Sequence, residues 1–329
     1  MLDQILKVFK IEPDYDLNIF KHGQTLSEIT CKSVMGIEGV IKEFRPDLLL
    51  VQGDTTAVFA GALAAFYNDV KIGHVEAGLR SGDLYSPYPE EANRKLTGIL
   101  TDLHFAPTEQ SKQNLLNEGY DKSKIFITGN TEIDSLYMVL DKNYKFEDEI
   151  IGSIDFENKK VIVMTAHRRE NIGKNMENIF EGIKAAVENN KDVEVIYAMH
   201  KNPEVRRIAY EILGNNERIH LTEPIDYLPF INLIAKSYMV ITDSGGIQES
   251  APALGKPVLV ARRETERPEG ILAGTARLIG VDRDEVYKHI NLLINDKEEY
   301  AKMANAVNPY GDGTAAENIV KIIKENQNI

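Results

Sequence analysis

Short apolar segments alternate with helix-compatible segments along almost the whole chain, and this alternation restricts the possible folds more than any other feature. In the first half, apolar segments of strand length lie at residues 47–52, 71–75, 103–106 and 125–128. The second half repeats the pattern at residues 161–165, 193–198, 218–221, 238–242 and 257–260. Strands that alternate with helices are typical of parallel sheets with helices on both faces. We therefore predict an α/β protein.

One of the intervening helices shows its buried face in the sequence. Between Ser27 and Phe44 the apolar residues recur with the period of an amphipathic helix. The residues that this period places on the inner face are Ile29, Val34, Ile37, Val40, Ile41 and Phe44.

The length of the chain indicates more than one domain. A chain of 329 residues exceeds one ordinary hydrophobic core, and two domains are the natural expectation. The polar segment 141–159 has no clear periodicity and is predicted to be a linker. We predict two doubly wound, Rossmann-like domains, residues 1–150 and 151–329, with a cleft between them. The terminal helix could pack back on the first domain.

Composition excludes several classes of protein. The chain has 38 lysines and arginines against 51 aspartates and glutamates, a formal net charge of -13, whereas a nucleic-acid surface would be basic. Its apolar runs are too short to span a bilayer, and no signal-peptide pattern opens the sequence. The single cysteine, Cys31, excludes an intrachain disulfide framework and is typical of a reducing compartment. We expect a cytoplasmic protein without nucleic-acid or membrane partners.

The stretch "GHVEAGLRSGDLYSPYPEEANRKL" concentrates carboxylates in a short space. Glu76 stands at the carboxyl end of a strand, and Glu90 stands in the first turn of a helix that begins after Pro89, where acidic residues are favoured. Ligands of open α/β sheets bind at such places. A solvated charged surface is the alternative for the stretch as a whole. Asp83 and Glu91 are interpreted as ordinary polar structure.

A third carboxylate follows the preceding strand. In "LLLVQGDTTAVFAGALAAF" the strand leads into a Gly53–Asp54 turn and then a helix. Asp54 is a candidate site residue, although it also lies where it could cap that helix.

Two histidines stand just past successive strands of the second half, His167 in "VIVMTAHRREN" and His200 in "VIYAMHKNPEV". A lone histidine is more often structural than catalytic. Two at successive strand ends of one sheet indicate a site.

A tight turn, Ser244–Gly245–Gly246, joins a strand to a helix in "MVITDSGGIQESAPALGKPVLV". Glycines there allow close backbone approach, and the first amides of the helix can bind phosphate. The turn is neither a P-loop nor the dinucleotide fingerprint, and alone it is a weak signal. Three arginines downstream would supply the positive charge that a diphosphate needs: Arg262, Arg263 and Arg267.

These motifs, taken together and in order, resemble one family. "MLDQ", "PDYDLNI", "GDTT", "GHVEAGLRSGDLYSPYPEEANR", "FAPTE", "FITGNT", "HRREN", "YLPF", "TDSGGIQE", "LGKPVLV", "TERPEG" and "NPYGDG" run nearly from end to end. The chain is similar to the non-hydrolysing UDP-N-acetylglucosamine 2-epimerases, which have a glycosyltransferase-B-like fold. The resemblance implies interconversion of UDP-GlcNAc and UDP-ManNAc, which supplies precursors for surface polysaccharides, and a homodimer.

The resemblance also implies roles for individual residues. It assigns catalysis to Asp54, Glu76, Glu90 and His167. It assigns substrate binding to Phe230 near uracil, to Arg267 and to the diphosphate loop of Ser244, Gly245 and Gly246. His200, from its place at a strand end, and Glu249 are further candidates for substrate binding. The second domain is then the UDP-binding one.

The implied reaction is elimination of UDP and its re-addition through 2-acetamidoglucal. The hydrogen on carbon 2 has no adjacent carbonyl, so simple enolisation cannot remove it. Carboxylates with separated pKa values can serve as acid and base on the two faces. No redox cofactor and no metal are expected, with a cation on the acidic residues and histidines as the alternative.

The chain departs from the family pattern at several places, including one glutamate and one whole segment. The second glutamate of the family's "QEE" is Ser250 here. The family also has, before "MLDQ", a strand, a "GTRPE" turn, a helix and a second strand, whose loss is expected to leave strand edges unpaired. We expect either that the true start lies upstream or that the gene is truncated and its product inactive. Rival hypotheses are a hydrolysing epimerase or glycosyltransferase on the same fold and an inactive, truncated UDP-sugar-binding protein.

Overall fold

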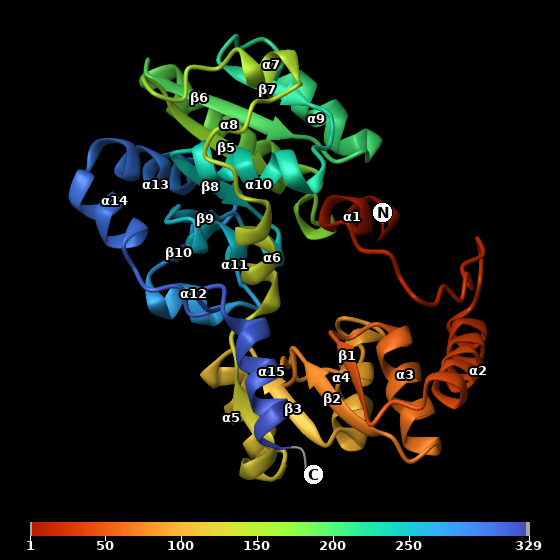
Figure 1. The fold of residues 1–329 in the computed structure, drawn as a ribbon. Coiled ribbons are helices and arrows are strands. Elements are labelled where there is room, and N and C mark those ends of the chain that lie inside the picture. Colours follow the sequence, from red (N-terminus) through yellow and green to blue (C-terminus); the bar gives the residue numbers. More distant parts are fainter. Residues whose placement is uncertain (1, 327–329) are drawn as a thin grey trace. The chain divides into compact units, whose positions relative to one another are not determined.

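The computed structural model describes residues 2–326, and its contacts divide the chain into two compact units (Figure 1). Unit 1 contains the residues up to Asp134 together with those from Tyr310 onward, and unit 2 runs from Ser135 to Pro309. The sequence predicts a boundary at residue 150, whereas the contacts place it at Asp134. Residues of the expected linker, among them Phe146 and Phe156, pack against the core of unit 2.

Unit 1 contains a four-stranded parallel sheet in the order β1-β2-β3-β4. The strands follow chain order and are β1 (Leu48–Gln52), β2 (Lys71–Val75), β3 (Leu103–Ala106) and β4 (Ile125–Ile127). The connecting helices are α3 (Thr56–Tyr67), α4 (Glu90–Leu100) and α5 (Glu109–Asn117). The last helix, α15 (Ala315–Glu325), returns to this unit and buries Ile319 against Val75, Leu103 and Phe105.

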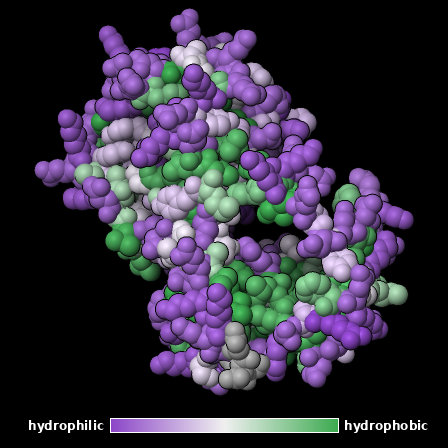
Figure 2. Space-filling view, in the orientation of Figure 1, coloured by the Kyte–Doolittle hydropathy of each residue, from purple (hydrophilic) through white to green (hydrophobic). Residues whose placement is uncertain are grey.

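Strand β1 forms one edge of this sheet. Leu50, near its centre, is 46% exposed, and Figure 2 shows hydrophobic surface on unit 1. The inner side of β1 packs through Leu49 and Val51 with α2 (Leu26–Phe44) and α3. One face of this edge strand is therefore covered and the other is open.

Helix α2 begins with a capping box, in which the Thr25 side chain accepts from the Glu28 amide and Glu28 accepts from the Thr25 amide. The prediction that Phe44 points inward is wrong, because Phe44 is 67% exposed. Ile41 is the last buried residue of the helix, and Phe44 lies in the final turn, which Arg45 ends in the left-handed conformation.

Unit 2 contains a six-stranded parallel sheet in the order β10-β9-β8-β5-β6-β7. Its strands are β5 (Lys160–Thr165), β6 (Val193–Ala198), β7 (Ile219–Thr222), β8 (Met239–Thr242), β9 (Val258–Val260) and β10 (Ala276–Leu278). The sequence does not predict β10, which has only three residues. Large apolar clusters lie on both faces of the sheet.

The main helices of unit 2 lie between its strands or after the last of them and complete a doubly wound domain. They are α8 (Lys174–Asn189), α9 (Pro203–Leu213), α10 (Tyr227–Lys236), α11 (Gly245–Ala253), α13 (Arg283–Asn295) and α14 (Lys297–Ala304). β6 and β7 extend the sheet on one side of β5, whereas β8, β9 and β10 extend it on the other. The strand order therefore reverses between β5 and β8. Such a switch point is where α/β sheets bind ligands, just beyond the carboxyl ends of the strands.

The remaining elements lie between those already described or at the start of the chain. They are α1 (Leu2–Phe9), α6 (Thr131–Val139), α7 (Glu149–Gly152) and α12 (Pro268–Ala273), with 3-10 turns at Lys122–Lys124 and Arg169–Asn171. Among residues 2–326, no helix has the length and apolar character needed to cross a membrane.

Candidate functional site

Two of the three candidate carboxylates lie at the carboxyl edge of the unit 1 sheet. Asp54 comes two residues after β1, and Glu76 comes directly after β2. These strands are neighbours and parallel, so both residues lie at the same edge. The Gly53 amide donates to the Val75 carbonyl at 3.1 Å, which ties the turn after β1 to the end of β2.

Glu76 adopts an unusual backbone conformation. Its φ of 64° lies in the left-handed region, where a non-glycine residue is strained unless its surroundings enforce the conformation. The Gln52 side-chain amide donates to Glu76 Oε1 at 3.1 Å and also to Thr131 Oγ1 at 3.0 Å. Two residues later, a Cβ at Gly78 would lie 2.2 Å from the Ser111 carbonyl oxygen, so only glycine fits. The turn after β2 is therefore closely specified.

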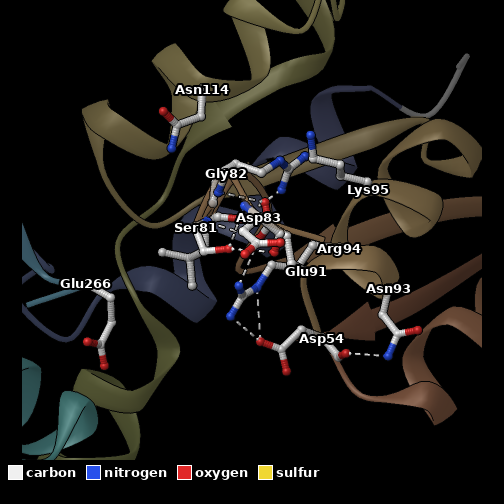
Figure 3. Close-up of polar contacts among 12 residues, drawn as sticks. Asp54, Ser81, Gly82, Asp83, Glu91, Asn93, Arg94, Lys95, Asn114 and Glu266 are labelled. Carbon is white, nitrogen blue, oxygen red and sulfur yellow. Dashed lines mark hydrogen bonds and ion pairs between the residues drawn. The ribbon is translucent and has the colours of Figure 1, made fainter. Parts of the chain in front are cut away.

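Asp54 does not cap the helix that follows it. The N-cap of α3 is Thr55, whose hydroxyl accepts from the Val58 amide. The Asp54 carboxylate instead pairs with Arg94 at 2.7 Å, and its backbone carbonyl accepts from the Asn93 side chain at 2.9 Å (Figure 3). Both partners lie on α4. The side chain of Asp54 is thus directed by a helix 40 residues away, and the alternative of a local cap does not hold.

The other acidic residues of the "GHVEAGLRSGDLYSPYPEEANRKL" stretch have different environments. Glu90 opens α4, is half-buried, and makes no side-chain hydrogen bond or ion pair within residues 2–326. Glu91 is completely buried and pairs with Arg94 at 3.1 Å. Asp83 is exposed, and its carboxylate accepts from the Tyr85 amide at 2.9 Å. Only part of the stretch is therefore a solvated charged surface.

A buried histidine that the sequence analysis does not single out supports the Asp54 turn. His74, on β2, places its Nε2 at 2.8 Å from the Gly53 carbonyl oxygen, to which it donates in the neutral form. Burial lowers the pKa of His74 to about 4, so the ring is neutral at pH 7. The available signal was a polar residue inside an otherwise apolar buried strand.

In unit 2, His167 is held by a buried carboxylate at the switch point. The backbone amides of His167 and Arg168 each donate to Asp243 Oδ2 at 2.9 Å, and His167 Nδ1 lies 3.4 Å from Asp243 Oδ1. Asp243 itself is fully buried after β8. Burial lowers the pKa of His167, and the negative charge of Asp243 opposes that change. Asp243 was not among the predicted site residues, because this contact spans 76 residues.

His200 lies beside His167, as their positions at successive strand ends predict. The two rings stack with centroids 5.6 Å apart. His200 Nδ1 accepts from the Asn202 amide at 3.1 Å, so the proton of the neutral ring is on Nε2. The structure thus brings both candidate histidines together at the carboxyl edge of the unit 2 sheet.

The predicted phosphate turn is the start of α11. Ser244 is its N-cap, and its amide donates to Thr242 Oγ1 at 2.9 Å. Gly245 is buried, and a Cβ there would lie 2.9 Å from Glu266 Oε1, whereas the same position at Gly246 meets no atom within 4 Å. The first amides of this nine-residue helix are those that can bind an anion.

The arginines around this turn are paired with acidic residues. Arg267, the N-cap of α12, donates through Nε to Glu249 Oε1, and both side chains are largely buried. Arg262 pairs with Glu266 and lies 3.5 Å from Glu170. Of the three predicted arginines, Arg263 is the exposed one. The positive charge near the turn is therefore partly compensated in this structure.

Two further candidates lie on the neighbouring helices. Phe230 is half-buried in the first turn of α10 and packs against the core of unit 2. Ser250, at the departure from the family pattern, is buried and donates to the Gly246 carbonyl at 2.9 Å. Within residues 2–326, no group of three or more histidine, cysteine or acidic side chains is arranged to hold a metal ion.

The family model for UDP-N-acetylglucosamine 2-epimerase matches residues 1–324 of this chain. The UDP-N-acetylglucosamine 2-epimerase of Bacillus subtilis is 50% identical over 321 residues, which cover 98% of this chain and 83% of that protein. The Escherichia coli enzyme of the same name is 49% identical over 332 residues, covering 99% and 88%. The chain belongs to the UDP-N-acetylglucosamine 2-epimerase family. As an epimerase it is an isomerase.

Solved structures of the epimerase family have the same fold. A putative UDP-N-acetylglucosamine 2-epimerase from Listeria monocytogenes matches with a TM-score of 0.94 and 52% identity, covering 99% of this chain and 86% of that one. The Neisseria meningitidis UDP-GlcNAc 2-epimerase, solved bound to UDP-GlcNAc, matches with a TM-score of 0.86 and 47% identity, covering 99% and 89%. The expected two-domain Rossmann-like fold of an epimerase is confirmed.

Asp243 should be essential to the stability of unit 2. Asp243→Asn removes the buried negative charge whose Oδ2 accepts from three donors, the amides of His167 and Arg168 and the Asn171 side chain, and replaces one oxygen by a nitrogen that cannot accept. We expect the free energy of unfolding to fall by about 3 kcal/mol, because hydrogen bonds to a buried charge are weakened. Urea unfolding followed by circular dichroism measures it. Asp192→Asn is the control, because its ion pair with Lys160 is exposed and should contribute less than about 1 kcal/mol. Equal effects of the two substitutions would contradict this account of Asp243.

Proposed function

We propose that this epimerase interconverts UDP-GlcNAc and UDP-ManNAc by elimination of UDP and its re-addition through 2-acetamidoglucal. The observation that carries the proposal is the placement of half-buried carboxylates, Asp54 and Glu76, at one edge of a parallel sheet in a chain of this family. The carbon-2 hydrogen of the sugar lacks an adjacent carbonyl. A base must therefore remove it while UDP leaves carbon 1.

The proton transfers are assigned to Asp54, Glu76 and Glu90. One carboxylate accepts the carbon-2 proton on one face of the sugar, and a protonated group returns a proton on the opposite face. The strained backbone of Glu76 supports its assignment, since such strain is concentrated at functional positions. His167 is the fourth catalytic candidate, near the diphosphate.

Binding of UDP is assigned to unit 2. The amides at the start of α11, with Ser244, Gly245 and Gly246, bind the diphosphate and stabilise its charge as it leaves. Arg267, held by Glu249, adds positive charge, and His200 lies beside His167. Phe230 contacts the uracil ring. The ribose contact cannot use a glutamate at position 250, where this chain has serine.

The proposal also covers the location of the enzyme, its oligomeric state and the use of its product. We expect the enzyme to act in the cytoplasm, as a homodimer, and to supply precursors of surface polysaccharides. Its single cysteine and acidic net charge of -13 support a cytoplasmic location without a nucleic-acid partner.

The elimination route makes a direct isotopic prediction. When the protein is incubated with UDP-GlcNAc in D₂O, the UDP-ManNAc formed should carry deuterium at carbon 2, because the proton leaves and solvent supplies its replacement. Proton NMR of the product measures this. A product that keeps its original hydrogen would rule out the elimination, and stoichiometric release of free UDP would indicate a hydrolysing enzyme or a transferase instead.

A further inference from the structure

Helix α4 contacts the turn that contains Asp54 through two side chains (Figure 3). Arg94 Nε and Nη2 both donate to Asp54 Oδ2, at 3.1 Å and 2.7 Å, while Asn93 donates to the Asp54 carbonyl at 2.9 Å. Asp54 Oδ1 makes no hydrogen bond within the described residues. One oxygen of the candidate carboxylate is therefore fixed, and the other is left for a ligand.

The guanidinium of Arg94 is itself fixed from the other side. Its Nη1 donates to Glu91 Oε2 at 3.1 Å, and its side chain is only 12% exposed. Because the guanidinium is planar, contacts on both of its ends determine its orientation, which a lysine could not reproduce.

Glu91 extends this network to the loop before the helix. It is completely buried, and its carboxylate accepts from the amides of Ser81 at 3.1 Å and Gly82 at 3.3 Å as well as from Arg94. A buried carboxylate needs such partners to be tolerated. Glu91, interpreted from the sequence as ordinary polar structure, connects the 81–82 loop to the arginine that holds Asp54.

We propose that Arg94, held by Glu91, is a positioning residue that fixes Asp54 Oδ2 and presents Oδ1 for proton transfer. The inference rests on the proposed role of Asp54 and adds two residues to it. Since Glu90 lies on the same helix, α4 sets the position of two of the candidate carboxylates together. Misplacement of a catalytic group by about 1 Å can cost about 100-fold in rate.

A double-mutant cycle separates positioning from general structural support. We expect Arg94→Ala to lower kcat by about 10-fold to 100-fold with a smaller change in KM. If Arg94 acts through Asp54, the same substitution in an Asp54→Asn background should lower kcat little further, because the group that it positions is already lost. Arg94→Lys should be nearly as impaired as Arg94→Ala, and added guanidinium should partly restore kcat in Arg94→Ala alone.

Arg80→Ala is the matched control. Arg80 is also a buried arginine of unit 1 and pairs with Glu118 through two nitrogens, at 2.9 Å and 2.8 Å, but has no contact with Asp54. Arg80→Ala should lower the melting temperature and leave kcat close to that of the unsubstituted enzyme. Circular dichroism checks that each variant is folded.

The outcomes separate the two proposals. Unsubstituted protein without epimerase activity would overturn the proposed function and, with it, the positioning role. An active protein whose Arg94→Ala variant keeps its kcat would overturn the positioning role alone. The positioning role would also be overturned if the double variant lost kcat by the product of the two single-variant losses. If Arg94→Ala does not fold, Arg94→Lys gives the same cycle with Asp54→Asn.

Discussion

Asp54→Asn, Glu76→Gln and Glu90→Gln should each lower the turnover number of epimerisation by at least about 100-fold, since each removes a positioned proton-transfer group. The substitutions are nearly isosteric, so the fold should be retained. The measurement is the rate of UDP-ManNAc formation from UDP-GlcNAc at saturating substrate, with circular dichroism to verify folding.

The three variants should differ in stability although all lose activity. Glu76→Gln keeps its left-handed backbone and replaces an acceptor for Gln52 by an amide that can still accept. Asp54→Asn loses its ion pair with Arg94, which is partly exposed, so the loss of stability should be modest. Glu90→Gln breaks no hydrogen bond within residues 2–326.

Asp83→Asn is the control for the carboxylates. Asp83 lies in the same stretch but is exposed, and within residues 2–326 its carboxylate accepts only from the nearby Tyr85 amide. The turnover number of Asp83→Asn should stay within about twofold of that of the unsubstituted enzyme, because Asp83 takes no part in proton transfer. Full activity in any of the three test variants would remove that residue from the catalytic group.

The second large effect is a loss of stability in weak acid that comes from two buried histidines. His74 and His104 are register neighbours on β2 and β3, and each residue is 1% exposed. Burial lowers the pKa of His74 to about 4 and that of His104 to about 3. The unfolded chain has ordinary histidines with a pKa of about 6.5.

The sign of the effect follows from these pKa values. Above pH 6.5 the histidines are neutral in both states, and their contribution to stability is fully present. As the pH falls below 6.5, the unfolded chain binds protons that the folded chain cannot, so stability falls until about pH 4 for His74 and about pH 3 for His104. Between pH 7 and pH 5 we expect each histidine to lower the free energy of unfolding by roughly 2 kcal/mol.

Urea unfolding at several pH values between 7 and 5 tests this expectation. The slope of the unfolding free energy against pH measures how many protons the chain takes up on unfolding. In the double variant His74→Gln/His104→Gln this number should be smaller by about two near pH 5, whatever the stability of the variant at pH 7. His22→Gln is the control, because His22 is exposed, and it should leave the slope unchanged. A double variant with the original slope would mean that these rings do not titrate as their burial implies.

The sequence by itself determined the elements and the family. β2, β3 and β6 begin and end where the apolar segments predict, because a buried parallel strand needs a short apolar run and glycine or polar residues at its ends. The same local rules placed Glu76 after a strand and Ser244 at the start of a helix. Motif order then identified the epimerase family, which the comparisons confirm.

Only the tertiary structure decided which side chains hold the candidate groups. Arg94 contacts Asp54 although the two are 40 residues apart in the sequence. Asp243 contacts the amides of His167 and Arg168, which are 76 and 75 residues away in the sequence, because β5 and β8 are neighbouring strands. His74 contacts Gly53 because β1 and β2 pair in one particular register. Periodicity reports only which face of an element is apolar, whereas these contacts depend on which elements are neighbours in the sheet. That is also why Phe44, which has the right period, lies outside the core.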